Sequence, residues 1–234
     1  MRIFPIGTRN CYTLRPQQGK DNKYLIRAAF FYGNYDTRNV APSFNVDIDT
    51  NFCFTSNGFD NHHRDVTYVP SRDYIQLCLI NAGSGIPFVF VIELCLLENE
   101  IYPFESNALA LFGRHALGSS KVHHRYPEDD FDRIWLQYAL SGAKDASNTT
   151  ILEINPSTNP YKVPIGVLET AQVLSDTQGW TNSSNSSDSW YIYMYFTEIQ
   201  ELQWSQSRQF SISIDNAVVR TESLQFATVT AFQS

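Results

Sequence analysis

The segment "FNVDID", residues 44–49, alternates apolar and polar side chains and ends in an aspartate. Side chains two positions apart point to the same face of a β-strand, so this alternation predicts a strand with one buried face and a turn led by Asp49. A related segment, "FSISID", occupies residues 210–215. One strand pattern is therefore predicted to occur twice.

The shift that places Phe44 on Phe210 also aligns "KYLIRAAFFYGNYD" (23–36) with "SWYIYMYFTEIQEL" (189–202) without a gap. Two strand pairs in one register predict a duplicated module of roughly 170 residues, a size that suits a β-sandwich. Since two such modules need more chain than 234 residues, we expect both to be incomplete. Residues 1–100 are predicted to form the C-terminal part of a first module, and residues 101–234 the N-terminal part of a second.

The composition favours an all-β protein, because 14% of the residues are aromatic and the predicted strands are separated by short polar turns. The net charge of −7 argues against a nucleic-acid partner. The longest apolar run, residues 86–97, is shorter than the ~20 residues that span a bilayer. The first residues lack the apolar region of a secretion signal. This chain itself is thus predicted to carry neither a signal peptide nor a membrane-spanning helix.

The cysteines and the asparagine sequons point instead to an extracellular protein. The even number of cysteines would allow two disulfides with three possible pairings, although buried thiols are an alternative. The candidates are Cys11, Cys53, Cys78 and Cys95. Three Asn-x-Ser/Thr sequons are candidate glycosylation sites, of which the last two lie in "TNSSNSS", a run that is also typical of a flexible loop. They begin at Asn148, Asn182 and Asn185.

Five segments, in this order, carry a family resemblance: "RNCYTLRPQQGKDNKYLIRAAFFYGNYD", "VPSRDYIQLCLINAGSGIPFVFVIEL", "LALFGRHALGSS", "RYPEDDFDRIW" and "WYIYMYFTEIQELQWSQSRQFSISID". Together they resemble the malectin-like ectodomain of plant leucine-rich-repeat receptor kinases, from Arg9 to Asp215. The resemblance implies tandem, jelly-roll-like malectin-type β-sandwiches at the cell surface. In full-length relatives it implies attachment to leucine-rich repeats, a membrane-spanning helix and a kinase domain. After Asp215 the tail no longer follows the family pattern.

The stretch "YGNYD" (32–36) offers a candidate ligand-binding loop. Sites for neutral sugars combine an aromatic face with polar groups that bind hydroxyls, and animal malectin, which binds a glucose-containing glycan, suggests the same loop. The candidates are Tyr32, Asn34, Tyr35 and Asp36. The alternative is a structural loop whose tyrosines cap the edge of the sandwich.

The acidic segment "RYPEDDFDRIW" (125–135) and two histidine pairs are possible sites of catalysis or metal binding. Four acids in five residues are more simply a solvated loop than a glycosidase pair or a calcium site, with Trp135 as a core anchor and Arg133 as a salt-bridge donor. The acids are Glu128, Asp129, Asp130 and Asp132. The pairs His62-His63 and His123-His124 are predicted in loops, and adjacent histidines rarely bind one ion. We therefore expect no catalytic residue, metal or cofactor.

These observations favour non-catalytic recognition by the ectodomain of a plant cell-surface receptor kinase. The predicted partner is a cell-wall carbohydrate or other glycan. The alternative is a secreted peptide or a co-receptor bound between the modules, and a carbohydrate-active enzyme that uses residues 128–132 is a weaker alternative.

Overall fold

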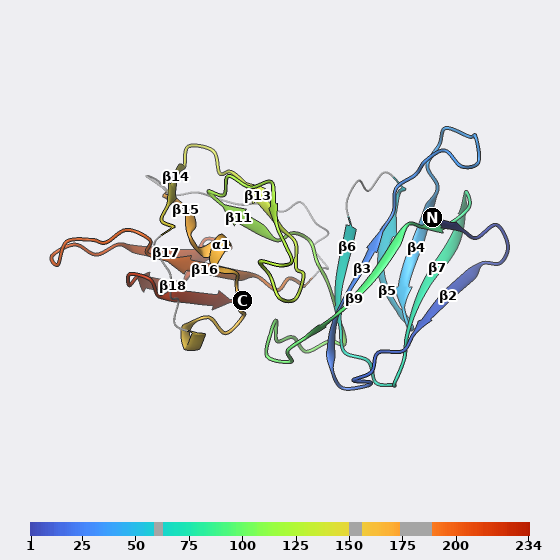
Figure 1. Ribbon diagram of the computed structural model, residues 1–234, viewed down its shortest axis with the longest axis horizontal. Helices are drawn as coiled ribbons and strands as arrows, with labels where there is room; N and C mark the ends of the chain where they lie inside the picture. The colour runs from blue at the N-terminus through green and yellow to red at the C-terminus, as the bar shows by residue number, and fades with distance from the viewer. Residues whose placement is uncertain (59–62, 150–155, 174–188) are drawn as a thin grey trace. The chain divides into compact units, whose positions relative to one another are not determined.

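The computed structural model describes residues 1–58, 63–149, 156–173 and 189–234. The chain divides into two compact units. Unit 1 comprises Met1–Asn99 and Pro103–Gly113, and unit 2 comprises Glu100–Tyr102 and Arg114–Ser234. Both are built from β-strands with short connections, so the prediction of an all-β fold is confirmed (Figure 1).

Unit 1 is a sandwich of two four-stranded antiparallel sheets. The first sheet has the order β2-β7-β4-β5, with β2 Arg9–Leu14, β7 Ile75–Ser84, β4 Ser43–Ile48 and β5 Asn51–Ser56. The second has the order β10-β6-β3-β9, with β10 Ala108–Ala110, β6 His63–Tyr68, β3 Lys23–Ala29 and β9 Val91–Leu97. A short pair, β1 (Arg2–Ile3) with β8 (Phe88–Val89), completes the unit.

The core of unit 1 lies between the two sheets. Strand β4 alternates half-buried and fully buried positions, as the "FNVDID" pattern predicts, and its apolar side chains Phe44, Val46 and Ile48 are buried. They pack in one cluster with alternate residues of β3 and β7. The ring of Phe30, just after β3, meets the ring of Phe44 edge-to-face with centroids 5.5 Å apart. The period-two pattern therefore places both strands correctly.

Strand β3 differs from a half-exposed strand, because both of its faces are covered. Lys23 and Arg27 are buried although the sequence alternation assigns them to the solvent side. Arg27 Nε donates to Asp65 Oδ1 of β6 (2.8 Å), and its Nη1 donates to Glu93 Oε2 of β9 (3.0 Å). Burying a guanidinium is costly without such partners, which come here from the two strands that flank β3.

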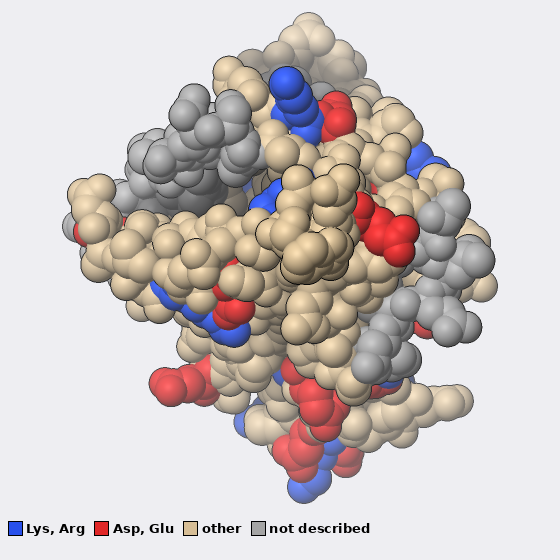
Figure 2. All heavy atoms as spheres, turned by 90° about the vertical axis from the view of Figure 1, so that its left-hand side faces the viewer, with Lys and Arg blue, Asp and Glu red and all other residues tan. Residues whose placement is uncertain are grey.

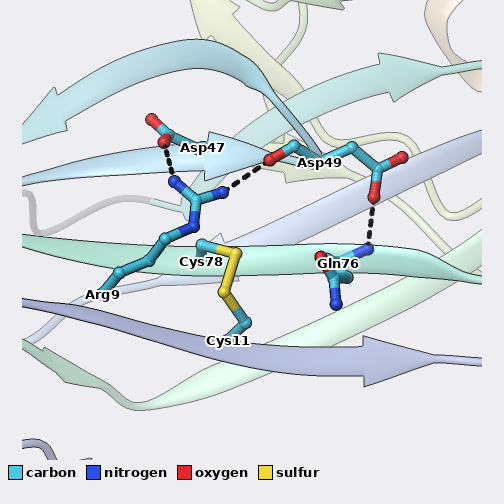
Figure 3. Close-up of a disulfide and its surroundings, with 6 residues drawn as sticks. All are labelled: Arg9, Cys11, Asp47, Asp49, Gln76 and Cys78. Atoms are coloured by element: carbon cyan, nitrogen blue, oxygen red, sulfur yellow. Dashed lines mark hydrogen bonds and ion pairs between the residues drawn. A yellow bond between two sulfur atoms is a disulfide. The ribbon is translucent and has the colours of Figure 1, made fainter.

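The Asp-led turn after β4 is held by its surroundings, as Figure 3 shows. Asp49 has φ = 53°, and its Oδ1 accepts a hydrogen bond from the Gln76 backbone N–H (2.8 Å). Arg9 reaches the same region, with Nη1 2.6 Å from Asp47 Oδ2 and Nη2 2.6 Å from Asp49 O. Beside it, Cys11 and Cys78, which face each other across β2 and β7, form a disulfide. This end of the first sheet is therefore cross-linked covalently and ionically.

Unit 2 has shorter strands in smaller sheets. Strands β11 (His115–Leu117), β13 (Trp135–Tyr138) and β12 (His123–His124) form one sheet. The other sheets in the described part of this unit are pairs: β14 (Lys144–Ser147) with β15 (Thr170–Val173), β16 (Tyr193–Thr197) with β19 (Val229–Gln233), and β17 (Gln209–Ile214) with β18 (Ala217–Ser223). A 3-10 turn, Pro156–Thr158, and a helical turn, α1 (Ile165–Leu168), lie between β14 and β15. The described part of residues 142–188 is thus mainly loop with two short strands.

The strand patterns that match in the sequence also match in the structure. Under the alignment of Phe44 with Phe210, β17 coincides with β4, β16 overlaps β3, and the Phe196 and Phe210 rings (4.4 Å) repeat the contact of Phe30 with Phe44. Asp215 has φ = 50°, close to that of Asp49. The β4–β5 pair shifts register after Val46, and the β17–β18 pair shifts at the aligned position, after Ile212. The repeat therefore extends to the irregularity of the hairpin.

The tail after Asp215 also continues the repeated pattern. The same alignment places the start of β5 on the start of β18, and the start of β6 on the start of β19. The repeat of strands therefore continues past Asp215.

Candidate ligand-binding loops and their surroundings

The loop between β3 and β4 brings all four predicted ligand-binding residues together in unit 1. Tyr32 and Tyr35 are half-buried, and their ring centroids lie 5.4 Å apart. Both rings also pack against buried Phe88, at 6.3 Å and 5.4 Å. Only part of each aromatic face is thus open to a ligand, and the rest joins the core cluster of the sandwich.

The polar atoms of this loop are engaged with one another. The Tyr32 hydroxyl donates to the Asp36 carboxylate and lies 3.1 Å from Asn34 Oδ1. The Tyr35 hydroxyl donates to the backbone oxygen of Ile86 (2.5 Å). Asn34, with φ = 52°, accepts from the Asn39 N–H (2.9 Å). A ligand hydroxyl would have to compete with these bonds.

The same contacts set the ionisation of the loop. Hydrogen bonding by the Tyr32 hydroxyl lowers the pKa of the Asp36 carboxyl. Burial, followed by the nearby Asp36 charge, raises the pKa of Tyr35 to about 12. Asp36 is therefore a carboxylate and Tyr35 a neutral donor at any physiological pH. This pair of states suits an internal hydrogen-bond network.

The loop at the equivalent place in unit 2 has a different character. It runs from Glu198 to Arg208, between β16 and β17, and its tip is Trp204, whose side chain is 100% exposed. The tip is a turn in which Gln206 N–H donates to Gln203 O (2.8 Å). Sequence reasoning missed this residue, because a tryptophan in a β-rich chain is usually a core residue.

The base of this loop is anchored in unit 2. Arg208 Nη1 donates to the buried Glu198 carboxylate (Oε1 at 2.8 Å), and its Nη2 donates to Gln200 Oε1 (3.1 Å). The buried Ile199 carbonyl accepts from Asn148 Nδ2 (2.7 Å). An open hollow of about 440 Å³ lies in the same loop and is lined by Leu202, Ser205, Gln206, Ser207 and Arg208. The hollow and the indole of Trp204 together form the candidate contact surface of unit 2.

The prediction of a solvated acidic loop at residues 128–132 is wrong for Asp129, whose carboxylate is held inside unit 2. Asp129 is buried and pairs with Arg133 Nε (Oδ2 at 2.8 Å), and the same oxygen accepts from Trp135 Nε1 (2.8 Å). Asp132 pairs with Arg125 (2.6 Å). The roles predicted for Trp135 as a core anchor and Arg133 as a salt-bridge donor are confirmed. Carboxylates committed in this way are not arranged for acid–base work on a sugar.

Around Arg133 lies a buried cationic and aromatic cluster that the sequence did not indicate. Arg114 and Arg133 both lie over the ring of Tyr102 (5.7 Å each) and over Trp135. Burial alone would raise the pKa of Tyr102, but the two guanidinium groups outweigh it and lower that pKa. Arg133 also donates to the backbone oxygen of Tyr161 (2.7 Å). This cluster is the polar centre of the unit 2 core.

A chain of three side chains links Ser119, His124 and Glu128 in unit 2. Ser119 Oγ lies 2.8 Å from His124 Nε2, and His124 Nδ1 lies 2.5 Å from Glu128 Oε2. The order resembles a nucleophile relay, but Ser119 and His124 are only 4% and 3% exposed. A reacting carbon has no access to the hydroxyl, so the chain serves to pin β12.

The sequence predicts the histidine pairs in loops, and this prediction is wrong for the described residues. His63 lies in β6, and His123 and His124 form β12, because both segments pair with a neighbouring strand. His123 is exposed and His124 is buried, on opposite faces as expected. His62 lies outside the described residues. Among the residues that the structure describes, no group of three or more His, Cys, Asp or Glu could hold a metal ion.

Of the four predicted disulfide candidates, only Cys11 and Cys78 are bonded to each other. Cys53 and Cys95 are thiols, the alternative that the even count left open. Burial raises the pKa of the Cys53 thiol to about 11. The side-chain nitrogen of the predicted sequon Asn148 is the donor to Ile199 O described above. Asn182 and Asn185 lie outside the described residues.

Comparisons with known proteins place the chain beside plant receptor kinases. A family model for the malectin-like domain matches residues 1–234, so the expectation that the tail after Asp215 departs from the family pattern is wrong. A probable LRR receptor-like serine/threonine-protein kinase of Arabidopsis thaliana, At1g05700, is 36% identical over 233 residues, 94% of this chain and 27% of its own length. A second from that plant, MEE39, is 34% identical over 226 residues, 94% of this chain and 25% of its own length. The chain thus spans about a quarter of these relatives.

Solved structures share the fold at low sequence identity. The structure of the plant peptide RALF23 in complex with FER and LLG2 contains a chain that superimposes with a TM-score of 0.76 at 13% identity, covering 99% of this chain and 72% of that one. The ANX2 ectodomain from Arabidopsis thaliana gives a TM-score of 0.73 at 14% identity, covering 99% and 71%. In the described parts of this chain, no helix has the length and apolar character needed to cross a bilayer.

Proposed function

The chain belongs to the malectin-like domain family, and from this premise we propose that it is an extracellular recognition segment of a plant receptor kinase that binds a secreted peptide, together with a second cell-surface protein. The segment is a malectin-like ectodomain and not a kinase domain. Its contribution is therefore binding, and the kinase of such receptors lies in other parts of the relatives. A position on the outer side of the plasma membrane follows from this proposal.

The likeness to the FER complex carries the proposal. That structure holds a malectin-like chain with the peptide RALF23 and the protein LLG2, and 99% of the present chain follows its fold. The loops at the strand ends differ between the two units of this chain, as expected where a constant scaffold carries variable contact residues. In unit 2 such a loop exposes a large aromatic side chain, the residue type that most often dominates protein interfaces.

A glycan ligand is the second candidate, because Tyr32, Asn34, Tyr35 and Asp36 lie together in one loop of unit 1. The polar atoms of this loop already bond to one another, so the peptide is favoured. The third reading, a carbohydrate-active enzyme, has less support, since Asp129 and Asp132 are held by Arg133 and Arg125.

The proposal is tested by measuring binding to the purified chain by calorimetry. One series uses secreted plant peptides, with and without a second cell-surface protein of the LLG2 type, and the other uses an array of cell-wall oligosaccharides. We expect saturable peptide binding that tightens when the second protein is present. Saturable binding of an oligosaccharide with no peptide binding would reverse the order of the candidates, and release of a shortened sugar would establish an enzyme.

A further inference from the structure

Trp204 is the most exposed large apolar side chain in the described part of the molecule. Of the other described tryptophans, Trp135 is buried beneath two arginines and Trp190 is 38% exposed. An indole that is left entirely in water loses the free energy that burial would bring, and both of its faces are open to a partner. Trp204 therefore has the property of a contact residue and not of a core residue.

The backbone that carries Trp204 is constrained by hydrogen bonds within unit 2. The Gln203–Gln206 turn closes the tip, and Arg208 ties the base to the buried Glu198. A backbone that is already ordered loses little conformational entropy on binding. A contact made by this loop would thus be stronger than the same contact made by a disordered segment.

The charges around the tip of the loop favour one charge type in a partner. Residues 202–207, "LQWSQS", carry no charge, and the cation at the base of the loop, Arg208, is matched by Glu198. Glu201, which precedes this uncharged run, is an exposed carboxylate. The tip therefore offers an electron-rich ring face and a negative charge to a partner.

The charge balance of the two units points the same way. Unit 2 holds 14 Asp and Glu against 8 Lys and Arg, whereas unit 1 holds 10 against 9. Figure 2 shows the side on which β17 and β18 lie in Figure 1, a mainly uncharged surface on which acidic side chains gather in a few places, some of them beside Lys or Arg. An excess of negative charge attracts a cationic partner over several ångströms and raises its rate of association.

We infer that the loop Glu198–Arg208 binds a Lys or Arg side chain of a cationic peptide, with the cation over the indole of Trp204 and near the carboxylate of Glu201. This rests on the proposed function and names the contact residue and the chemistry of the peptide. A cation over an aromatic face is favourable most of all for tryptophan. The polar hollow lined by Ser205, Gln206 and Ser207 would accept the adjacent peptide backbone.

The test uses the whole chain and three probes: a short synthetic peptide in which Lys and Arg alternate with Gly, the same peptide with Glu at the charged positions, and cellohexaose. Binding is followed by calorimetry and by tryptophan fluorescence. The contribution of Trp204 to the fluorescence change is the difference between the wild type and Trp204→Phe. We expect the cationic peptide to bind and the other two not to bind. Trp204→Ala should weaken binding by about fivefold or more, and Trp204→Phe by less, because an aromatic ring is kept.

The charge contribution has its own matched pair of variants. Glu201→Gln and Asp130→Asn each remove one negative charge from an exposed position of unit 2. We expect Glu201→Gln to weaken binding by about twofold to fivefold at low salt and Asp130→Asn to have a smaller effect. Equal effects of the two variants would show that only overall charge matters, and would overturn the assignment to this loop.

The remaining outcomes separate the inference from the proposed function. If secreted peptides bind the chain but Trp204→Ala binds them as tightly, the inference is wrong and the proposed function stands. If cellohexaose binds and Trp204→Ala abolishes it, the loop is a saccharide site and the inference is wrong. If no peptide of any kind binds the wild-type chain, the proposed function is wrong and the inference fails with it. Circular dichroism of each variant checks that the fold is kept.

Discussion

The two loops that follow equivalent strands, residues 30–42 in unit 1 and 198–208 in unit 2, differ in where their aromatic side chains lie. In the first, Tyr32 and Tyr35 pack on the core and their hydroxyls bond within unit 1. In the second, Trp204 is fully exposed. The strands, the Asp-led turns and the register shift repeat between the units. The comparison teaches that similar strands and turns recur at matching positions while the loop chemistry differs.

The largest expected effect tests whether the repeated strands contribute equally to the stability of their units. Phe44 is completely buried, whereas Phe210 is half-buried. We expect Phe44→Ala to lower the free energy of unfolding of unit 1 by about 3–5 kcal/mol, because it leaves a cavity between two sheets. Phe210→Ala should lower that of unit 2 by about 1–2 kcal/mol, since less apolar area is lost. Amide hydrogen exchange, read separately in β4 and β17, measures both.

Equal losses in the two units would contradict this prediction and would mean that Phe210 is as well packed as its counterpart. Val219→Ala, at an exposed position of β18, is the control for a substitution that removes methyl groups without opening a cavity. It should change the stability of unit 2 by less than about 0.5 kcal/mol.

The disulfide gives the second expected effect, because it is confined to unit 1. Cys11 and Cys78 are 67 residues apart, so the bond restricts a long loop of the unfolded chain. We expect the double variant Cys11→Ala/Cys78→Ala to lose about 2–5 kcal/mol of stability in unit 1 and none in unit 2. Denaturation with guanidinium chloride, followed by hydrogen exchange in each unit, checks this.

The control for the disulfide is Cys53→Ala, which removes a thiol that is not disulfide-bonded. A reducing agent should shift the unfolding midpoint of the wild type and of this control, but not that of the double variant. A loss of stability in unit 2 on reduction would show that the two units do not unfold independently.

The sequence predicts the scaffold well because its signal is local. The alternation in "FNVDID" and "FSISID" and the Asp-led turns each depend on residues within a few positions. The full burial of β3 could not be predicted, since the partners of Arg27 come from strands 38 and 66 residues away. The sequence indicates that the four residues of the unit 1 loop lie together. It could not predict the hydrogen bond from Tyr35 to Ile86, because these residues are 51 positions apart. Long-range pairing is what one sequence does not reveal.

The third prediction contrasts the two loops directly through their effect on stability. Tyr35→Ala should destabilise unit 1 by about 2–4 kcal/mol, since it removes a ring packed on Phe88 and a hydrogen bond to Ile86. Trp204→Ala should leave the stability of unit 2 within about 0.5 kcal/mol, because its side chain contacts water. Thermal unfolding, with Tyr35→Phe to isolate the hydroxyl at about 1 kcal/mol, gives the measurement.

If Tyr35→Ala folds as stably as the wild type, the unit 1 loop is not a structural loop and becomes the better candidate for a ligand. A large loss of stability in Trp204→Ala would mean that the indole packs on unit 2, and would remove its role as an open contact.

The smallest expected effect is the dependence of stability on pH, which involves one carboxylate in each unit. A hydrogen bond from the Tyr32 hydroxyl lowers the pKa of the Asp36 carboxyl in unit 1. Hydrogen bonds from Lys121 and, to a smaller extent, from His124 lower the pKa of the Glu128 carboxyl in unit 2. A carboxyl whose pKa is lower in the folded state contributes stability above its unfolded pKa and loses it as pH falls through the folded value. For Glu128 that window lies below 4.5. Its side chain is 36% exposed, so we expect a contribution of about 0.5 kcal/mol or less.

Glu128→Gln should therefore be slightly less stable than the wild type at pH 7 and should equal it once the pH is well below 4.5, where the wild-type carboxyl is protonated. Unfolding free energies of unit 2, measured by hydrogen exchange at several pH values, test the sign. Asp130→Asn, at an exposed acid of the same segment, is the control for the loss of one negative charge from this segment. If Glu128→Gln stays less stable at low pH by the same amount, then the hydrogen-bonded geometry around His124, and not the charge of Glu128, is what holds β12 in place.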